Sequence, residues 1–275
     1  MMNDRKLIVS AVQMECLVKD KERNLAKALG FLEEFRNKVD VDIVCFPELF
    51  TTGYNLDMIG NDFHDLAETI PGKTTSIMSQ KAMECNVAIL GTIVEKDERG
   101  NLYDTTFVID ETAGLIGKYR KSHLHPSEYP YFESGNELAV FELARVRIGV
   151  AICFEHAFPQ IFTTLALLGA KIVFIPSAVP MGYEYLVNLR TRARAQDNQL
   201  FVVAVNRVGQ EGDVKYCGSS KVVDPRGDIV AEAPPNKEEV LIAELDLGLI
   251  QKEREQEPVL TCLRPELYPH GSRVR

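Results

Sequence analysis

The sequence contains neither a long apolar run nor an excess of positive charge, and each absence excludes a class of protein. Its longest apolar stretches, such as residues 200–205, have the length of a strand, whereas a membrane-spanning helix needs about 18 or more apolar residues. The formal net charge of −9 disfavours a surface that binds nucleic acid. No apolar signal segment precedes the first expected strand. We therefore expect a cytoplasmic protein that binds neither nucleic acid nor membranes.

Cysteine and histidine are too scattered to indicate a disulfide framework or a metal site. No two of the six cysteines form a Cys-x-x-Cys pair, which predicts six reduced thiols in a chain of this size. The five histidines show no zinc-ligand spacing, and the pair His123 and His125 is a weak metal signal by itself. We therefore expect no metal and no other cofactor.

Linkers rich in glycine, serine or proline are also absent, and strand and helix patterns alternate along the chain. We expect strands at residues 7–13, 43–46, 87–94, 101–109, 114–120, 138–143, 146–152, 171–176, 200–205, 218–223, 229–233 and 240–246. We expect helices at residues 19–38, 74–84, 158–168 and 185–197. The pattern predicts one domain over residues 1–275, with a core at about residues 6–247 and a mixed C-terminal tail at residues 248–275.

The order of strand, helix, strand and hairpin occurs in both halves of the chain. This repetition predicts an α/β protein with two mixed sheets in contact and helices on the outside.

An apolar strand pattern in the second half ends in a thiol. Cys153 follows the apolar run, and polar residues begin two positions later. Open α/β sheets place their chemistry at the carboxyl ends of strands, which favours a reactive role for this thiol. The alternative is a buried structural residue, because free cysteine mostly behaves as a small hydrophobe.

Two other segments carry groups that can assist a thiol. Glu48 follows an apolar strand and Pro47, although a carboxylate in this place is otherwise a solvated charge at a strand end. In the basic segment after the first expected hairpin, Lys121 and His123 alternate as on one face of an extended chain. The alternatives for that segment are a solvated face or an anion-binding loop.

Taken together, these segments resemble the nitrilase superfamily, also called the carbon–nitrogen hydrolases. The motifs Phe46-Pro-Glu-Leu-Phe, Lys118-Tyr-Arg-Lys-Ser-His-Leu and Ile152-Cys-Phe-Glu-His-Ala-Phe-Pro occur in the order of that family. The resemblance covers essentially residues 6–247. It implies a four-layer α-β-β-α sandwich of two mixed sheets with outer helices, assembled as a homodimer or a higher homo-oligomer.

The resemblance also implies a catalytic triad of Glu48, Lys121 and Cys153, with a second glutamate at Glu128, seven residues after the lysine. A carboxylate such as Glu48 can take the thiol proton as a general base. The Lys121 ammonium and the backbone N–H of Phe154 are the natural donors to the oxyanion that attack on a carbonyl creates.

The roles of several neighbouring residues stay open at this stage. Tyr54 and His156 are candidates for lining the substrate pocket, and Glu133 is the rival of Glu128 as the second glutamate. Tyr129 and Phe132 are expected to pack rather than to contact substrate.

The chain departs from the family pattern beside the thiol. His156 and Ala157 stand where carboxylate-binding relatives often carry arginine. Because arginine is favoured for bidentate recognition of a carboxylate, we expect neutral or cationic amides to react better than amides with a nearby carboxylate.

An arginine of the helix expected at residues 185–197 is the alternative source of positive charge. Arg190, Arg192 and Arg194 could each reach the site from that helix. For Arg194 we instead expect a structural ion pair with Glu155.

The expected activity is the cofactor-independent hydrolysis of a non-peptide C–N bond in a small amide or carbamoyl compound, through a cysteine thioester and with release of ammonia or an amine. One alternative is a nitrilase that acts on a nitrile. True nitrilases typically carry tryptophan after the cysteine, and this chain contains none, which favours the amide. The other alternative is a non-catalytic member of the family that serves as a binding protein.

Overall fold

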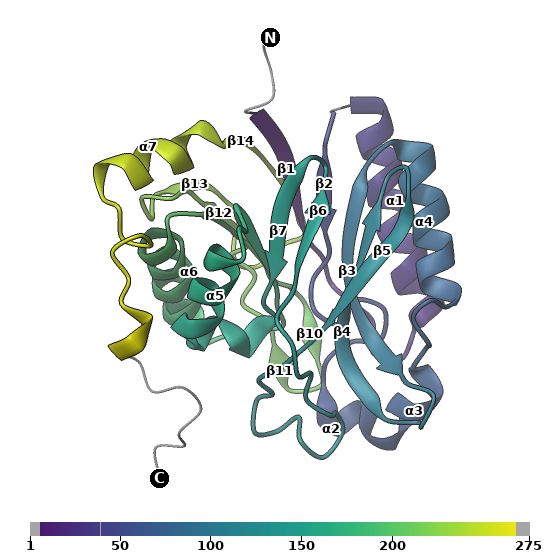
Figure 1. Cartoon of the computed structure of the whole chain (residues 1–275). Helices are drawn as coiled ribbons and strands as arrows, with labels where there is room; N and C mark the ends of the chain where they lie inside the picture. Colours follow the sequence, from purple (N-terminus) through teal and green to yellow (C-terminus); the bar gives the residue numbers. More distant parts are fainter. Residues whose placement is uncertain (1–5, 39, 268–275) are drawn as a thin grey trace.

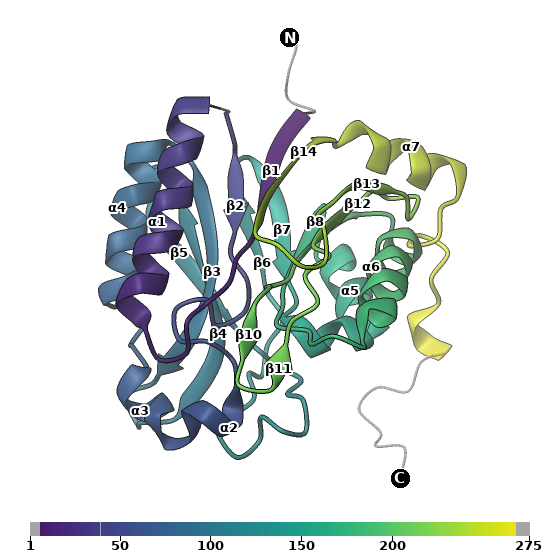
Figure 2. The same cartoon turned by 180° about the vertical axis from the view of Figure 1, so that it is seen from behind.

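The computed structural model of the protein describes residues 6–38 and 40–267, and its two large six-stranded sheets lie face to face. A pair of long helices covers the outer face of each sheet, so the layers follow the order helices, sheet, sheet, helices (Figure 1; Figure 2). The predicted α-β-β-α sandwich of two mixed sheets is confirmed. The expectations for residues 1–5 and for the end of the tail, residues 268–275, fall outside the described residues.

Each sheet contains three neighbouring parallel strands with antiparallel strands on both sides. The first sheet has the order β14 (Glu239–Asp246), β1 (Lys6–Gln13), β2 (Ile43–Cys45), β3 (Ala88–Lys96), β4 (Leu102–Asp110) and β5 (Gly114–Arg120). The second has the order β13 (Ile229–Glu232), β12 (Lys221–Val223), β9 (Phe201–Val205), β8 (Ile172–Pro176), β7 (Val146–Val150) and β6 (Val140–Leu143). The parallel strands are β1, β2 and β3 in one sheet and β7, β8 and β9 in the other, so the two halves repeat one arrangement, as predicted.

The long helices bury apolar stripes against the sheets. The first sheet is covered by α1 (Lys21–Lys38) and α4 (Lys73–Cys85), and the second by α5 (Pro159–Leu167) and α6 (Glu184–Asn198). Ala28, Leu32 and Phe35 recur at helical spacing in α1 and share a buried cluster with Met78 and Ala82 of α4. Among the described helices, none combines the length and the apolar character that crossing a bilayer requires.

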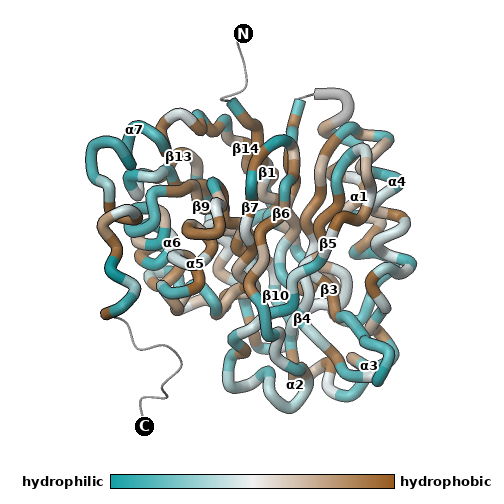
Figure 3. The backbone as a smooth tube through the Cα atoms, in the orientation of Figure 1, coloured by the Kyte–Doolittle hydropathy of each residue, from teal (hydrophilic) through white to brown (hydrophobic). Residues whose placement is uncertain are grey.

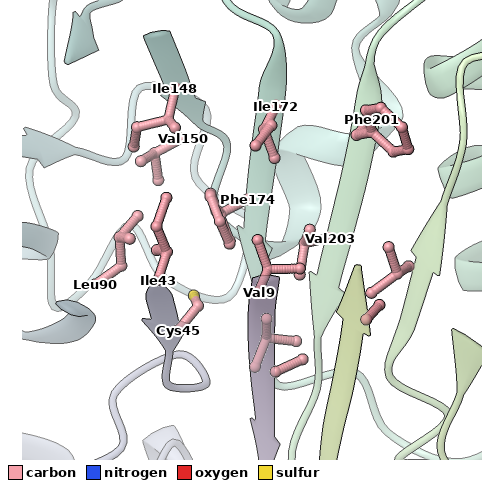
Figure 4. Close-up of a cluster of buried hydrophobic side chains, with 14 of the residues drawn as sticks. Val9, Ile43, Cys45, Leu90, Ile148, Val150, Ile172, Phe174, Phe201 and Val203 are labelled. Carbon is pink, nitrogen blue, oxygen red and sulfur yellow. The ribbon is translucent and has the colours of Figure 1, made fainter. Parts of the chain in front are cut away.

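The two sheets share one apolar core because their strands are buried on both faces. Along β1, Val9 points into the core between the sheets, whereas Val12 belongs to the cluster under α1 and α4. Ile172 and Phe174 of β8 enter the same central core from the second sheet (Figure 4). Side chains from both sheets therefore hold the strand ends of one sheet at a fixed distance from those of the other.

Some elements were not predicted. Residues after 247 were expected to be a mixed tail, but they begin with α7 (Gly248–Gln256), whose Ile250 is buried. The helix is hydrophilic along most of its length (Figure 3), so it lacks the apolar period that sequence analysis detects. Other short elements are α2 (Leu56–Ile59), α3 (Phe63–Leu66), β10 (Gln210–Glu211), β11 (Val214–Lys215) and three 3₁₀ turns at Gly60–Asp62, Cys153–Ala157 and Pro265–Leu267. Elements of two to five residues are too short to show a period.

Candidate active site

The ammonium of Lys121 lies in the middle of a fully buried group of carboxyl side chains. Its Nζ is 2.6 Å from Glu48 Oε1, 2.6 Å from Glu128 Oε1 and 3.4 Å from Asp104 Oδ2. None of the four side chains is accessible to solvent. Burial by itself lowers the pKa of a lysine, but Glu48 and Glu128 outweigh it and raise the pKa of Lys121 well above its ordinary value. The lysine is therefore a fixed cation.

This buried group is assembled at the ends of strands of the first sheet. Glu48 follows β2, and Lys121 follows β5 directly. The backbone N–H of Lys121 donates to the carbonyl of Asp104, 2.9 Å away, which continues the ladder between β4 and β5. Glu128 lies in the next turn, where its N–H donates to the carbonyl of His125 at 2.8 Å. The structure thus brings together Glu48, Lys121 and Glu128, the three predicted charged site residues.

Asp104 is the member of the group that sequence analysis missed. Burial and then the charge of Glu48 raise the pKa of Asp104 well above its ordinary value, so this carboxyl holds a proton. With Asp104 neutral, the group contains two carboxylates and one ammonium. Its one sequence signal is a charged residue inside a strand that is otherwise mostly buried.

Replacing Asp104 with asparagine is expected to leave kcat within about threefold of the wild type, because the amide has the shape and the neutrality of the protonated acid. Asp104→Ala removes the oxygen near Lys121 and is expected to cost about 1–3 kcal/mol, which corresponds to roughly 5-fold to 150-fold in rate. The two variants are compared by steady-state kinetics, with circular dichroism as the control for folding. A loss in Asp104→Asn as large as that in Asp104→Ala would show that the ionised carboxylate is needed.

Glu48, Asp104 and Glu128 are also a possible metal-binding set, since ligand atoms of all three lie within 4.8 Å of one another. The ammonium of Lys121 already lies between two of them, at hydrogen-bond distance from both. A divalent cation at this place would therefore have to displace a buried positive charge.

Treatment with EDTA is accordingly expected to leave the rate of turnover unchanged. The measurement is activity after dialysis against the chelator, with added zinc, manganese or magnesium as the comparison. A loss of activity that one of these ions restores would contradict the assignment of the cationic role to Lys121.

Cys153 comes from the second sheet and lies in the turn that follows β7. The turn is a 3₁₀ helix, Cys153–Ala157, and the cysteine adopts a left-handed conformation with φ of 47°. Such a conformation costs a non-glycine residue about 1–2 kcal/mol, so the surroundings must hold it. The side chain is buried, yet it lines the cavity described below.

Glu155 joins the cysteine turn to the segment that carries Lys121. Its Oε2 accepts from the N–H of Ile152 at 2.7 Å, and its Oε1 accepts from the N–H of Ser122 at 2.8 Å and from the hydroxyl of Tyr119 at 2.7 Å. Burial opposes ionisation, but these bonds and the neighbouring His123 hold the pKa of Glu155 below its ordinary value. One carboxylate therefore connects the end of β5 with the end of β7.

The expected ion pair between Arg194 and Glu155 is wrong. Arg194 Nε donates to the carbonyl oxygen of His156 at 3.2 Å, and its guanidinium pairs with Asp197 at 3.5 Å. Backbone and hydroxyl donors already satisfy Glu155, which leaves no place for a guanidinium.

The thiol of Cys153 is close enough to the buried group to feel its charges. Burial and then the charge of Glu48 raise the pKa of Cys153 well above its ordinary value, while Lys121 acts in the opposite direction. The resting residue is therefore a protonated thiol beside a carboxylate. Lys121 contacts Glu48 through Oε1, and the Asp104 carboxyl also hydrogen-bonds to Glu48, so Oε2 is the oxygen of Glu48 that no described ammonium, N–H or hydroxyl contacts.

A cavity of about 640 Å³ opens onto this thiol. Tyr54, Phe154 and His156 line it, and Phe154 directly follows the cysteine. Lys121 and the three carboxyl side chains around it are fully buried and are not among the lining residues. Further lining residues include Tyr131, Ala178, Tyr183, Arg190 and Tyr216.

The predicted lining residues keep fixed protonation states. The hydroxyl of Tyr54 donates to Glu128 Oε1 at 2.6 Å, and burial raises its pKa well above the ordinary value. Burial, followed by the charges of Arg190 and Arg194, lowers the pKa of His156 to about 3, so its imidazole is neutral. Neither side chain therefore brings a charge to the cavity.

The remaining expectations are resolved by burial. Glu133 is exposed and takes no part in the buried group, so Glu128 is the second glutamate of the cluster. Phe132 packs against Phe63 with ring centroids 5.0 Å apart, as expected. Tyr129 was also expected to pack, but the residue is 63% exposed, so this expectation is wrong.

Comparison with known proteins identifies the family to which this site belongs. Residues 8–255 match the sequence profile of the carbon–nitrogen hydrolases. The chain belongs to the carbon–nitrogen hydrolase family. The predicted resemblance and the predicted enzyme class, an amidase- or nitrilase-type hydrolase, are both confirmed.

This carbon–nitrogen hydrolase resembles its relatives over nearly their full length. It is 35% identical over 248 residues to a protein of Pyrococcus abyssi named nitrilase, which covers 90% of this chain and 92% of the relative. It is 30% identical over 265 residues to 2-oxoglutaramate amidase of Bacillus subtilis, which covers 96% of this chain and 100% of the relative. The crystal structure of Saccharomyces cerevisiae Nit3, a member of branch 10 of the nitrilase superfamily, superposes with a TM-score of 0.87 at 30% identity, covering 96% and 97% of the two chains.

Proposed function

We propose that this carbon–nitrogen hydrolase cleaves a non-peptide C–N bond in a small amide or carbamoyl compound through a thioester on Cys153. The observation that carries the proposal is the place of Cys153 in the wall of a cavity of about 640 Å³, where its thiol is within the electrostatic influence of the buried pair Glu48 and Lys121. The relatives named ω-amidase and 2-oxoglutaramate amidase support an amide as the substrate class. No described step requires a cofactor.

In the first step Glu48 takes the proton of the Cys153 thiol while the sulfur attacks the carbonyl carbon. The carbonyl oxygen becomes an oxyanion, which the ammonium of Lys121 and the backbone N–H of Phe154 stabilise. These donors act in a site that excludes water, where a charge interaction is much stronger than in bulk solvent.

In the second step the protonated Glu48 gives its proton to the nitrogen, the C–N bond breaks, and ammonia or an amine leaves. A thioester on Cys153 remains. Glu48, again a carboxylate, takes a proton from water as that water attacks the thioester. The acid is released, and the proton returns to the sulfur.

Glu128 acts in this proposal by positioning the other groups. It holds Lys121 together with Glu48 and accepts a hydrogen bond from the hydroxyl of Tyr54, a residue of the cavity wall. The lysine is thereby fixed between two carboxylates and cannot follow the substrate.

Ammonia release from a panel of short aliphatic amides, ω-amides, carbamoyl amines and nitriles tests the proposal. Release from amides or carbamoyl amines supports it. Release from nitriles alone would indicate the nitrilase alternative, and binding without turnover would indicate a binding protein.

The proposal includes a homodimer or a higher homo-oligomer as the working form. The outer helices of the second sheet support it, because large apolar side chains on α5 and α6 are exposed, among them Leu167 at 56% and Leu189 at 65%. Light scattering during size exclusion gives the molar mass that tests this assembly.

A further inference from the structure

The cavity beside Cys153 contains one guanidinium, that of Arg190 in α6. Of the other described lining residues, Asp57 is the one that carries a fixed charge, and it lies exposed on α2. His156 is neutral, and the remaining walls are largely aromatic or aliphatic. A cavity of this size and lining, with one guanidinium and one exposed carboxylate, is typical of a site that orients a small ligand through few polar contacts.

The guanidinium of Arg190 has no partner within the protein as far as the structure describes it. No hydrogen bond or ion pair joins it to a described residue, although it is half-buried. The other two arginines of α6, Arg192 and Arg194, do have partners within the protein. Arg192 Nε donates to the carbonyl oxygen of Gly227 at 2.7 Å, and Arg194 bonds to His156 and Asp197. Among the three arginines of α6, Arg190 alone therefore offers free donors to a ligand in the cavity.

Arg190 also lies near the reacting end of the cavity. After burial, the charge of Arg190 contributes most to the lowered pKa of His156. Both residues line the cavity, and His156 is three residues after Cys153 in the same turn. An anion bound by Arg190 would therefore share the cavity with a carbonyl group placed at the thiol.

We propose that Arg190 determines the substrate specificity of this site by binding a carboxylate of the substrate, so that short monoamides of dicarboxylic acids are preferred. The inference rests on the proposed amide hydrolysis and adds its substrate class. It reverses the preference for neutral or cationic amides that the missing arginines at positions 156 and 157 suggested. The carboxylate anchor comes from α6 instead of the cysteine turn. A guanidinium suits this role, since its planar donors match the two oxygens of a carboxylate.

The test compares the monoamide of glutaric acid with pentanamide, a neutral amide of the same chain length. The wild type is expected to show a kcat/KM at least about tenfold higher for the acidic amide, which corresponds to about 1.4 kcal/mol. Arg190→Gln is expected to remove this preference, mainly through KM. Arg190→Lys should keep part of it, because the charge remains while the planar pair of donors is lost. Arg192→Gln removes the same charge two residues away and should keep the full preference.

A second measurement separates this inference from the proposed function. Binding of glutarate, followed by calorimetry, needs no turnover and is expected to weaken at least about tenfold in Arg190→Gln but not in Arg192→Gln. If no amide is hydrolysed but glutarate binding depends on Arg190, the proposed function fails and the anion site stands. If amides are hydrolysed with the same ratio of acidic to neutral substrate in the wild type and in Arg190→Gln, the assignment of Arg190 is overturned. Circular dichroism of each variant shows that the fold is kept.

Discussion

Cys153→Ala is expected to abolish turnover, with a loss in kcat of at least about a thousandfold, while the fold is kept. The thiol is the nucleophile of the proposed reaction, and no other described cysteine lines the cavity. Removing one sulfur from the cavity wall leaves the four-residue charged group intact behind it. Steady-state kinetics and the thermal unfolding curve of the variant are the two measurements. Activity above a few per cent of the wild type would contradict the thioester mechanism.

Alkylation provides the matched control for Cys153. Iodoacetamide should inactivate the wild type, and substrate should protect it. Cys262 is exposed and is expected to react as well, so the rate of inactivation must be measured in Cys262→Ser. In the reaction with substrate, without iodoacetamide, peptide mapping should find the acyl adduct of the thioester on Cys153 but not on the buried Cys217 or on Cys85. If modification of another cysteine instead followed the loss of activity, that cysteine and not Cys153 would be the nucleophile.

Lys121→Ala is expected to lower kcat by at least about a hundredfold, because in the proposed reaction it removes a donor to the oxyanion worth about 3–4 kcal/mol. The same change leaves Glu48 and Glu128 buried together without their cation, which also destabilises the fold by about 3–5 kcal/mol. Kinetics must therefore be measured well below the melting temperature of the variant.

Two further variants separate catalysis by Lys121 from its part in stability. Lys121→Arg keeps the positive charge, yet it should not restore turnover, since a planar guanidinium cannot occupy the position of a compact ammonium between Glu48 and Glu128. Glu48→Gln keeps the size of the side chain and removes the base, and should cost at least about a hundredfold in kcat. Near-normal turnover in Lys121→Arg would argue against direct contact between Lys121 and the substrate oxygen.

The sequence predicts the site best where a residue lies one to three positions after the end of a strand. Glu48, Lys121 and Cys153 follow β2, β5 and β7, and their places along the chain indicate which edge of the sandwich they share. The apolar runs also locate the strand ends in the sequence, because a strand buried on both faces is a continuous apolar run and stops where polar residues begin. Glu128 was predicted from its spacing within a family motif, and the structure brings it to the same ammonium.

Residues whose role depends on the direction of a side chain could not be predicted in the same way. Asp104 lies inside β4, where the pattern shows a charge but does not show which groups surround it. Arg190 and Arg192 are two residues apart on one helix, and how α6 lies on the second sheet decides which of them faces the cavity. Arg194 was assigned to Glu155 on charge alone, whereas neutral backbone N–H groups donate hydrogen bonds to both oxygens of Glu155.

The hydrogen bonds of Glu155 have a mechanical consequence for the enzyme. Glu48 and Lys121, the proposed base and oxyanion donor, belong to one sheet and Cys153 belongs to the other, so the proposed reaction depends on alignment across the plane where the two sheets meet. Glu155 links the two sheets at that plane, because its carboxylate accepts from the backbone N–H of Ser122 on one side and of Ile152 on the other. A disturbance that lets one sheet slide on the other would separate sulfur from base while every strand remained hydrogen-bonded. A measurement of kcat should therefore detect a small displacement of one sheet relative to the other that a measurement of secondary-structure content would miss.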